Sequence, residues 1–459
     1  MKKTMVKLLL LFFPFLALSQ DINGSWHGEL EIQGVKLPLV FNIKTEGTLL
    51  KTTLDSPKQG AKDIPVKNTL FDNNTLSIDA SDLGISYKGN YNNEKIEGTF
   101  KQGNMEIPLV LEKNQTKKEY SFNRPQTPKE PFNYKTEEVS FVNPIDKNTL
   151  AGTISAPNDK KNLPIVIMIT GSGGQNRDEE LFGHKPFAVI ADDFAKKGIA
   201  TLRLDDRGIG GSSKVEKKST TADFATDINS AVDFLLQKGY TNIGLLGHSE
   251  GGMIAPMVAT MNKKVKFIIS MAGPGIKITD LMLKQIEEGG LLSGENPEKV
   301  KLNISTSKKL YDFILTYNGN ELDKDLETYY INELKQYPSD FIKFDKIEDQ
   351  AKSEIKQITN PWFLYFLKFD PQHYISKIKI PVLAINGSKD FQVNAESNLD
   401  GFKKALTKAG NKKFEVVTFD GLNHLFQECK TGAFSEYAEI EQTIAPKVLD
   451  KMSNWILKL

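Results

Sequence analysis

The stretch NIGLLGHSEGG, residues 242–252, decides the fold of this chain. It joins an apolar strand, NIGLL, to a helix that begins GMIAPM, and Ser249 lies at the junction in the pattern G-H-S-E-G, Gly247–Gly251. Glycines on both sides of a serine allow a strained turn in which Cβ atoms would not fit, and such a turn presents the hydroxyl at the carboxyl edge of a sheet. We therefore expect Ser249 to be a nucleophile.

Apolar runs alternate with helical patterns on both sides of this stretch. The predicted strands are LPIVIMIT (163–170), GIATLRLD (198–205), VKFIISMAG (265–273), IPVLAING (380–387) and KFEVVTFDG (413–421), and helix-period segments lie between them. A hairpin of EEVSFVN and LAGTISAP precedes them. Repeated strand–helix–strand units predict an α/β fold with a mostly parallel sheet covered on both faces.

A serine nucleophile needs a base, and few histidines can supply one. The chain has five histidines, and only His373 and His424 follow Ser249. In this type of fold the chain order is serine, then the acid, then histidine. His373 precedes the strand after which the acid belongs, whereas His424 lies in the loop GLNH after the last strand. We expect His424 to act as general base and then acid.

The carboxylate that orients the base follows the preceding strand. Asp390 lies in GSKDFQV directly after IPVLAING, at the edge of the sheet where His424 is expected. Asp400 falls within a predicted helix and Asp420 on the strand before the histidine, so both are weaker candidates. The predicted triad is therefore Ser249, Asp390 and His424.

Two backbone N–H groups must stabilise the developing oxyanion. One should belong to Glu250, and the other to the loop GSGGQNRDEE, residues 171–180. We choose the amide of Ser172, with Gly173 as the alternative, because glycines let this backbone approach a substrate closely. We expect the Glu250 side chain to pair with Arg177 or Arg207, although binding of a substrate amine stays open.

Other residues near the predicted site are expected to be structural. We expect His248 to pack beneath the nucleophile turn, His184 to be structural or on the surface, and Arg207 in LDDRGIGGS to brace neighbouring loops. Cys429, the only cysteine, is expected to be an inert buried thiol. A single cysteine excludes a disulfide within the chain and a multi-cysteine zinc site.

The first 135 residues divide into three segments. Residues 1–20 have a basic start, a short apolar run and a small-residue A-x-S pattern, so we expect a secretory signal peptide and an exported protein without stable membrane insertion. Residues 21–113 read as short alternating strands of a small all-β, barrel-like domain. Residues 114–135 are polar and proline-rich, which predicts a semi-rigid linker.

Residues 136–459 form the predicted catalytic domain, and one region interrupts its rhythm. Residues 276–371 carry helical, charged segments and end in the aromatic cluster NPWFLYFLKFDP, 360–371. We interpret this region as a helical lid insertion. Trp362, Phe363 and Phe366 could form either an apolar wall for substrate or the core of the lid.

The charge balance excludes one class of function. The chain carries 59 Lys and Arg against 58 Asp and Glu, and loss of the signal segment with Lys2, Lys3 and Lys7 changes the net charge from +1 to −2. A nucleic-acid-binding protein needs a concentrated basic face, so we expect no nucleic-acid partner. The oligomeric state cannot be inferred from the sequence.

The chain resembles the α/β-hydrolase family over about residues 140–459. The resemblance rests on the motifs TGSGGQNRD, DDRGIGGS, GHSEGG, GSKDFQV and GLNH. The resemblance is closest to bacterial esterases and to the catalytic domains of prolyl-oligopeptidase-like peptidases. One departure is Thr170, where many relatives carry a histidine. The N-terminal segment resembles a lipocalin-like domain through G-x-W, Asp55–Pro65 and Glu97–Gly103.

The resemblance implies hydrolysis of short to medium acyl esters of small molecules, through an acyl-enzyme and without metal or organic cofactor. A serine peptidase of aminopeptidase or prolyl-oligopeptidase type is the alternative. The N-terminal domain is too short for a propeller, whose blades take about 40–50 residues each. A non-catalytic ligand-binding protein on a hydrolase scaffold is a third interpretation, which the complete triad disfavours.

Overall fold

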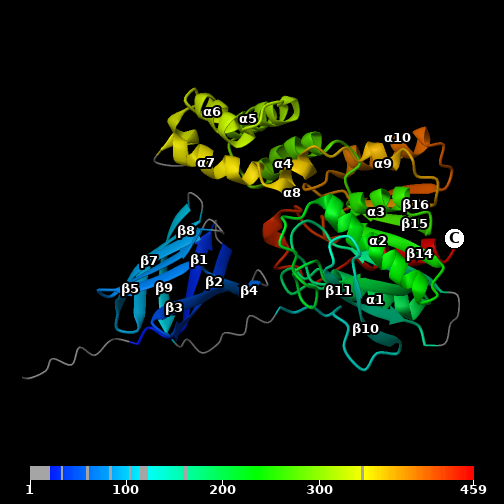
Figure 1. Cartoon of the computed structure of the whole chain (residues 1–459), viewed down its shortest axis with the longest axis horizontal. Coiled ribbons are helices and arrows are strands. Elements are labelled where there is room, and N and C mark those ends of the chain that lie inside the picture. Colours follow the sequence, from blue (N-terminus) through cyan, green and yellow to red (C-terminus); the bar gives the residue numbers. More distant parts are fainter. Residues whose placement is uncertain are drawn as a thin grey trace, which may run out of the picture. The chain divides into compact units, whose positions relative to one another are not determined.

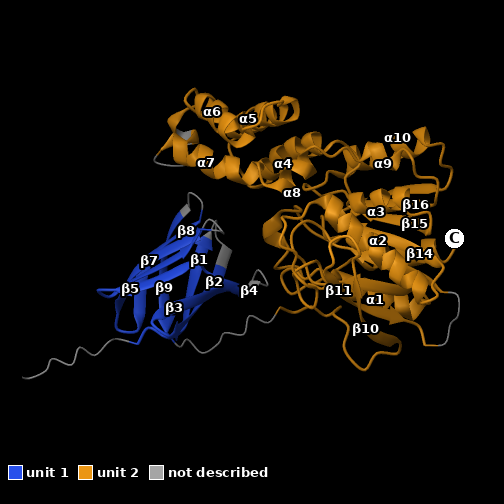
Figure 2. Cartoon of the chain, in the orientation of Figure 1, with its two compact units in different colours: residues 1–57, 61–119 blue, residues 58–60, 120–459 orange. Residues whose placement is uncertain are grey.

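The computed structural model of the chain describes residues 21–32, 35–57, 61–81, 85–102, 105–113, 122–158, 163–342 and 346–459. The predicted signal peptide, residues 1–20, lies outside the described residues. The chain forms two compact units, residues 1–57 with 61–119 and residues 58–60 with 120–459 (Figure 2). We describe each unit by itself.

Unit 1 is an antiparallel sheet. Its nine strands lie in the order β4-β3-β2-β1-β9-β8-β7-β6-β5. The sheet curls, so that β5 at one end lies against β3 near the other, where the Thr69 hydroxyl donates to the Thr52 hydroxyl, 2.8 Å away. The strands are β1 (Gly24–Ile32), β2 (Val35–Glu46), β3 (Leu49–Ser56), β4 (Ala61–Pro65), β5 (Asn68–Asp72), β6 (Thr75–Ala80), β7 (Ile85–Asn92), β8 (Lys95–Gln102) and β9 (Met105–Lys113).

Alternation of side chains builds the core of this unit. In β6 every second residue is buried, as expected for a strand with one face on a core. Large aromatic side chains fill that core, and Trp26 donates its indole N–H to the Ile22 carbonyl, 2.8 Å away. The prediction of a small all-β, barrel-like domain is confirmed.

Unit 2 has a mixed sheet of eight strands in the order β10-β11-β13-β12-β14-β15-β16-β17. The hairpin β10–β11 and the pair β11–β13 are antiparallel, and all later pairs are parallel. The strands are β10 (Lys135–Val142), β11 (Thr149–Ala156), β12 (Pro164–Ile169), β13 (Ala200–Leu204), β14 (Asn242–His248), β15 (Val265–Met271), β16 (Val382–Gly387) and β17 (Phe414–Phe419). The central strands are almost wholly apolar because both faces are covered.

Helices cover the two faces of this sheet (Figure 1). Helices α2 (Thr221–Gln237), α3 (Glu250–Met261), α9 (Gln372–Ile375) and α10 (Ala395–Lys408) pack on one face. Helices α1 (Pro186–Lys197) and α11 (Pro446–Ile456) pack on the other. This is the α/β-hydrolase fold that the sequence predicts, and the carboxyl ends of its parallel strands meet at one edge.

The segment between β15 and β16 is helical, as predicted, and its helices are coloured green to yellow in Figure 1. They have a core of their own around Leu310, Leu326 and Leu367. Helix α8 begins at Pro361, and the side chain of Asn360 caps it by accepting the Trp362 N–H, 3.0 Å away. The helices are α4 (Ile278–Leu292), α5 (Pro297–Thr316), α6 (Leu322–Leu334), α7 (Ile347–Ile358) and α8 (Pro361–Leu367).

The predicted linker differs from the structure in its second half. Residues 114–121 lie outside the described residues, but Arg124 belongs to unit 2 and is buried there. Its guanidinium donates to the carbonyls of Phe182, Ala438 and Ile440, at 2.8, 2.7 and 2.8 Å. A polar stretch with prolines resembles a free linker in sequence, yet one arginine with several carbonyl acceptors holds this part on the catalytic unit.

Candidate active site

Ser249 occupies a strained turn between β14 and α3. Its φ is 52° and its ψ is −118°, a conformation that L-residues rarely adopt. A Cβ atom on Gly247 would lie 1.9 Å from the Gly251 carbonyl oxygen, and one on Gly251 would lie 2.2 Å from the Ile169 carbonyl oxygen. The two flanking glycines are therefore a steric requirement of the turn, as the sequence predicts.

His424 and Asp390 form a buried pair. The imidazole Nδ1 of His424 lies 2.7 Å from Asp390 Oδ2, while Asp390 Oδ1 accepts the backbone N–H groups of Gln392 and Val393, both at 2.9 Å. These amides fix the carboxylate, and the carboxylate in turn favours the tautomer of His424 with its proton on Nδ1. Nε2 is then left to accept a proton.

The loop of the histidine lies directly against the serine turn. The ring of His248, the residue before the nucleophile, lies 4.7 Å from the ring of His424, and its Nε2 is 3.0 Å from the His424 carbonyl oxygen. Among the described residues no hydrogen bond joins the Ser249 hydroxyl to His424. Such bonds are often long in ligand-free enzymes and shorten when substrate binds. The structure thus brings together the loops of all three residues of the predicted triad.

The loop after β12 lies beside the nucleophile. A Cβ atom on Gly171 would lie 3.2 Å from Ser249 Cβ. The N–H of Gly171 donates to Glu179 Oε1 at 2.8 Å and that of Gln175 to Asp206 Oδ2 at 2.8 Å. Ser172 and Gly173, whose amides we consider for the oxyanion hole, lie between these two anchored residues and are exposed.

The predicted partner of Glu250 is wrong. Its carboxylate accepts the Thr221 hydroxyl at 2.6 Å and the Trp362 indole N–H at 3.0 and 3.3 Å. The two arginines are engaged elsewhere, since Arg177 pairs with Asp205 at 2.7 Å and Arg207 with Asp227 at 2.7 Å. The position of Glu250 in the sequence does not show which acidic residues pair with these arginines in the fold.

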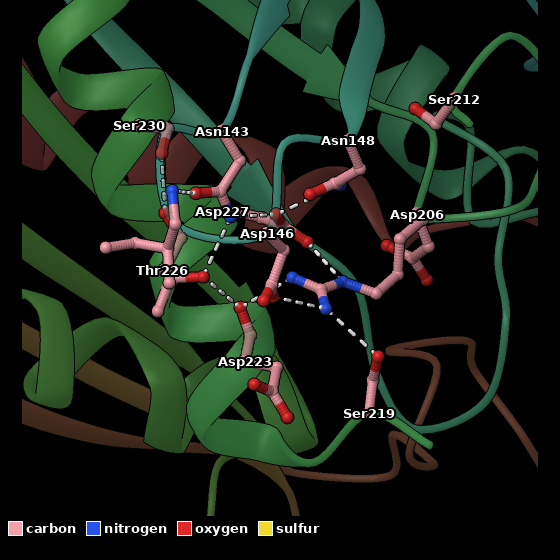
Figure 3. A network of polar contacts seen from close by, with 12 residues as sticks. Asn143, Asp146, Asn148, Asp206, Ser212, Ser219, Asp223, Thr226, Asp227 and Ser230 are labelled. Atoms are coloured by element: carbon pink, nitrogen blue, oxygen red, sulfur yellow. Dashed lines mark hydrogen bonds and ion pairs between the residues drawn. The ribbon is translucent and has the colours of Figure 1, made fainter. Parts of the chain in front are cut away.

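Arg207 braces its surroundings, as predicted. Its Nη1 lies 2.9 Å from Asp146 Oδ2 and 3.0 Å from Ser219 Oγ, and its Nη2 donates to the Asp223 carbonyl at 3.0 Å. Figure 3 shows these acidic residues gathered between the β10–β11 turn and helix α2. The network fixes the loop that carries Asp206.

Of the three aromatic residues that the sequence left open, Phe363 packs against the core of the insertion, whereas Phe366 and Trp362 pack in the main core of unit 2. The ring of Trp362 stacks on that of Phe366 with centroids 5.2 Å apart. It also lines an open cavity of about 430 Å³ next to the oxyanion loop. The other lining residues are Gly173, Gly174, Asp206, Arg207, Gly208, Lys214, Val215, Ser219 and Phe224.

Two carboxylates near the nucleophile turn have altered acidity: Asp206, which lines this cavity and is partly buried, and Glu250, which is buried. Burial, helped by the charges of Glu179 and Glu250 and opposed by the hydrogen bonds of Gln175 and Thr170, raises the pKa of Asp206 to about 7. Burial also raises the pKa of Glu250, opposed by its bonds to Thr221 and Trp362. Thr170 is the position where many relatives carry a histidine, and its hydroxyl lies 2.9 Å from Asp206 Oδ1.

The remaining candidates are structural. His184 is buried, with its ring nitrogens 2.9 Å from Thr443 Oγ1 and 3.0 Å from the Tyr437 carbonyl oxygen. Cys429 is only half-buried, not buried as expected, because it lies on the loop after β17. The described residues contain no cluster of His, Cys, Asp and Glu side chains that could hold a metal, and none of their helices is long and apolar enough to cross a membrane.

Comparison with known proteins identifies the family of this chain. Residues 185–428, more than half of the chain, match the Hydrolase_4 family model, described as serine aminopeptidase, S33. The chain belongs to this family. The matched region of the hydrolase contains Ser249, Asp390 and His424, whereas the oxyanion loop at 171–175 precedes it.

Individual relatives of this serine hydrolase carry esterase names. Esterase EstD of Thermotoga maritima is 27% identical over 319 residues, which are 68% of this chain and 67% of the relative. Among solved structures, the α/β-hydrolase GrgF from Penicillium sp. is 17% identical with a TM-score of 0.43, covering 71% of this chain and 98% of its own. A Pyrococcus furiosus esterase is 15% identical with a TM-score of 0.43, covering 71% and 91%.

Sequence reasoning missed several residues that support the site of this hydrolase. Glu179 lies in the run RDEE, whose residues look alike in sequence. Thr221 is the first residue of α2, next to the N-cap Thr220, and only the tertiary fold brings it to Glu250 and brings Glu179 to His248. A buried carboxylate acceptor cannot be distinguished from an exposed one by chain order or periodicity.

Proposed function

We propose that this serine hydrolase is a carboxylesterase that uses Ser249, His424 and Asp390 to cleave small-molecule esters. The observation that carries the proposal is the 2.7 Å pair of His424 and Asp390 beside the strained turn of Ser249. A nucleophile, a base with a free Nε2 and a fixed carboxylate on three adjacent loops are the parts that acyl transfer needs.

The mechanism follows from these positions. His424 Nε2 removes the hydroxyl proton as Ser249 Oγ attacks the ester carbonyl, and the amides of Glu250 and Ser172 stabilise the oxyanion. The proton passes from His424 to the departing alkoxide, which leaves as an alcohol. The acyl group stays on Ser249 as an acyl-enzyme. A water molecule deprotonated by His424 then attacks the acyl carbonyl, releasing the acid and restoring the serine.

Glu250 favours an ester over an aminoacyl substrate. Recognition of a substrate ammonium would need a carboxylate that is free to bind it, but the Glu250 carboxylate is buried and already accepts hydrogen bonds from Thr221 and Trp362. The cavity beside it has Phe224, Val215 and Trp362 in its wall, which suits the apolar acyl or alcohol group of an ester.

The test compares substrate classes on the purified chain. We expect turnover of p-nitrophenyl esters from acetate to laurate, with the best kcat/KM for short to medium chains, and no turnover of aminoacyl- or dipeptidyl-anilides. Ser249→Ala should abolish ester turnover, while Ser213→Ala, an exposed serine on the loop after β13, should not. Cleavage of anilides without ester turnover would support the aminopeptidase alternative.

We also propose that the enzyme is exported, on the strength of the first twenty residues. The test expresses the full chain in a bacterium and determines the N-terminus of the product by mass spectrometry. We expect a start near Ser19 or Gln20 in the exported fraction. A product that retains residues 1–20 in the cytoplasm would contradict the proposal.

A further inference from the structure

His248 is buried between two hydrogen-bond acceptors. Its Nδ1 lies 3.0 Å from Glu179 Oε1 and its Nε2 lies 3.0 Å from the carbonyl oxygen of His424. Both side chains of the His248–Glu179 pair are at least nine-tenths buried, with 8% and 6% of their surfaces exposed. The mechanism proposed above does not use His248.

The identity of the acceptors determines the protons on the ring. A carbonyl oxygen can only accept, so Nε2 must carry a proton, and a carboxylate also accepts, so Nδ1 must carry the second. A ring with both protons is an imidazolium. Burial is the largest single influence and opposes this charged form, but Glu179, the His424 carbonyl and Asp390 together outweigh it and raise the pKa of His248.

The pair connects three functional loops. The same Glu179 oxygen that faces His248 accepts the N–H of Gly171, 2.8 Å away, at the start of the oxyanion loop. Glu179 itself has a φ of 53°, so its backbone is held in an unfavourable conformation by the surrounding contacts. His248 precedes the nucleophile and holds the backbone of the base.

The charged groups around His248 are few. Glu179 contacts it directly, the imidazole of His424 lies beside it on the loop after β17, and the Asp390 carboxylate acts on it from the loop after β16. The ring of Phe426 closes the remaining side, with its centroid 6.5 Å away. Two carboxylates therefore act on one imidazolium in this buried region.

We propose that His248 is a positioning residue of the hydrolase centre, held as an imidazolium by Glu179, that fixes the nucleophile turn, the backbone of the base and the oxyanion loop relative to one another. The inference rests on the proposed function for its kinetic consequence. Its physical core, a doubly protonated buried histidine, does not.

The first test is spectroscopic and needs no substrate. Two-dimensional ¹H–¹⁵N NMR of the imidazole groups, at about pH 8, should show one histidine with protons on both nitrogens. That signal should be missing in His248→Gln. In Glu179→Gln, His248 should be singly protonated, since the carboxylate charge that stabilises its second proton is removed. A singly protonated His248 in the unaltered protein would overturn the proposal.

The second test is kinetic, on the ester that is turned over best. His248→Phe keeps a ring but removes both hydrogen bonds, so we expect kcat to fall about 10- to 100-fold with KM changed less than about twofold. Glu179→Gln removes the charge, but its amide can still bond either His248 or the Gly171 N–H, so it should cost less than His248→Phe. His373→Gln, on an exposed histidine of α9, is the matched control and should leave kcat unchanged.

The outcomes separate the two proposals. A folded His248→Phe variant with unchanged kcat would overturn the positioning role, whatever the substrate. Retained ester hydrolysis in Ser249→Ala would refute the proposed nucleophile, yet the NMR result for His248 would stand. If His248→Phe fails to fold, the spectrum of the unaltered protein still decides the charge.

Discussion

The indole N–H of Trp362 lies 3.0 Å from Glu250 Oε1 and 3.3 Å from Oε2, so the helical insertion is tied to the residue that follows the nucleophile. The backbone N–H of this same glutamate is expected to stabilise the oxyanion. Any displacement of helix α8 therefore acts on the start of α3. The contact gives the insertion a direct connection to the chemistry.

We predict that Trp362→Phe lowers kcat/KM by about fivefold to tenfold, because Glu250 keeps only its bond to Thr221 and a buried acceptor loses its donor. A double-mutant cycle with Glu250→Gln, measured on a p-nitrophenyl ester, tests this. The coupling energy should be about 1 kcal/mol. Additive single effects would show that the two side chains do not act together.

The acid of the triad can be tested against its neighbour on the next loop. We predict that Asp390→Asn lowers kcat about 10³- to 10⁴-fold, because the His424 tautomer that accepts a proton is no longer favoured. Asp420→Asn is the control, since Asp420 is exposed and, among the contacts described, its carboxylate accepts only the Ser388 hydroxyl, at 3.0 Å. Steady-state ester kinetics should leave this control within about twofold of the unaltered enzyme.

Chain order explains why the sequence predicts which loops carry Ser249, Asp390 and His424. The type of fold follows from alternating apolar and helical segments, and each parallel strand ends at the same edge. A loop position after β14, β16 or β17 therefore fixes where Ser249, Asp390 and His424 lie. These predictions depend only on topology.

The contacts of side chains could not be predicted in the same way. The sequence predicts an arginine partner for Glu250, but Arg177 pairs with Asp205 and Arg207 with Asp227. Glu250 instead accepts a hydrogen bond from Trp362, 112 residues away in sequence. The His248–Glu179 pair likewise joins residues 69 positions apart. Such choices depend on side-chain direction and competition for donors, which periodicity does not encode.

The lowered pKa of His184 predicts that the protein loses stability in acid. Burial, and then the charge of Arg124, lowers its pKa to about 4, whereas the unfolded chain has a value near 6.5. Between pH 6.5 and 4 the unfolded state binds a proton that the folded state does not, so the free energy of unfolding falls as the pH falls through this window, by roughly 2 kcal/mol. Urea unfolding at about pH 7 and pH 4.5 measures it.

The histidine can be isolated by substitution. His184→Gln can still reach Thr443 and the Tyr437 carbonyl but does not titrate, so its stability should depend less on pH than that of the unaltered protein. His373→Gln, in which an exposed histidine is changed, should keep the original dependence. Equal pH dependence in all three proteins would contradict the role of His184.

The raised pKa of Asp206 predicts the opposite pH dependence, a free energy of unfolding that falls as the pH rises. Burial holds its pKa at about 7, against an ordinary value of 3.8, so the folded state keeps a proton that the unfolded state has lost. The contribution of this group to stability is therefore complete below about pH 4 and is lost as the pH rises to about 7. The loss should be roughly 3 kcal/mol.

Asp206→Asn separates this titration from the hydrogen bonds of the side chain. Asparagine can accept the Gln175 N–H through Oδ1 and donate to the Thr170 hydroxyl, and it stays neutral. Relative to the unaltered protein, the variant should therefore gain stability between about pH 5 and pH 8, as measured by urea unfolding. Asp400→Asn, at an exposed carboxylate paired with Lys404, should show no such gain, and a gain of equal size there would refute the assignment to Asp206.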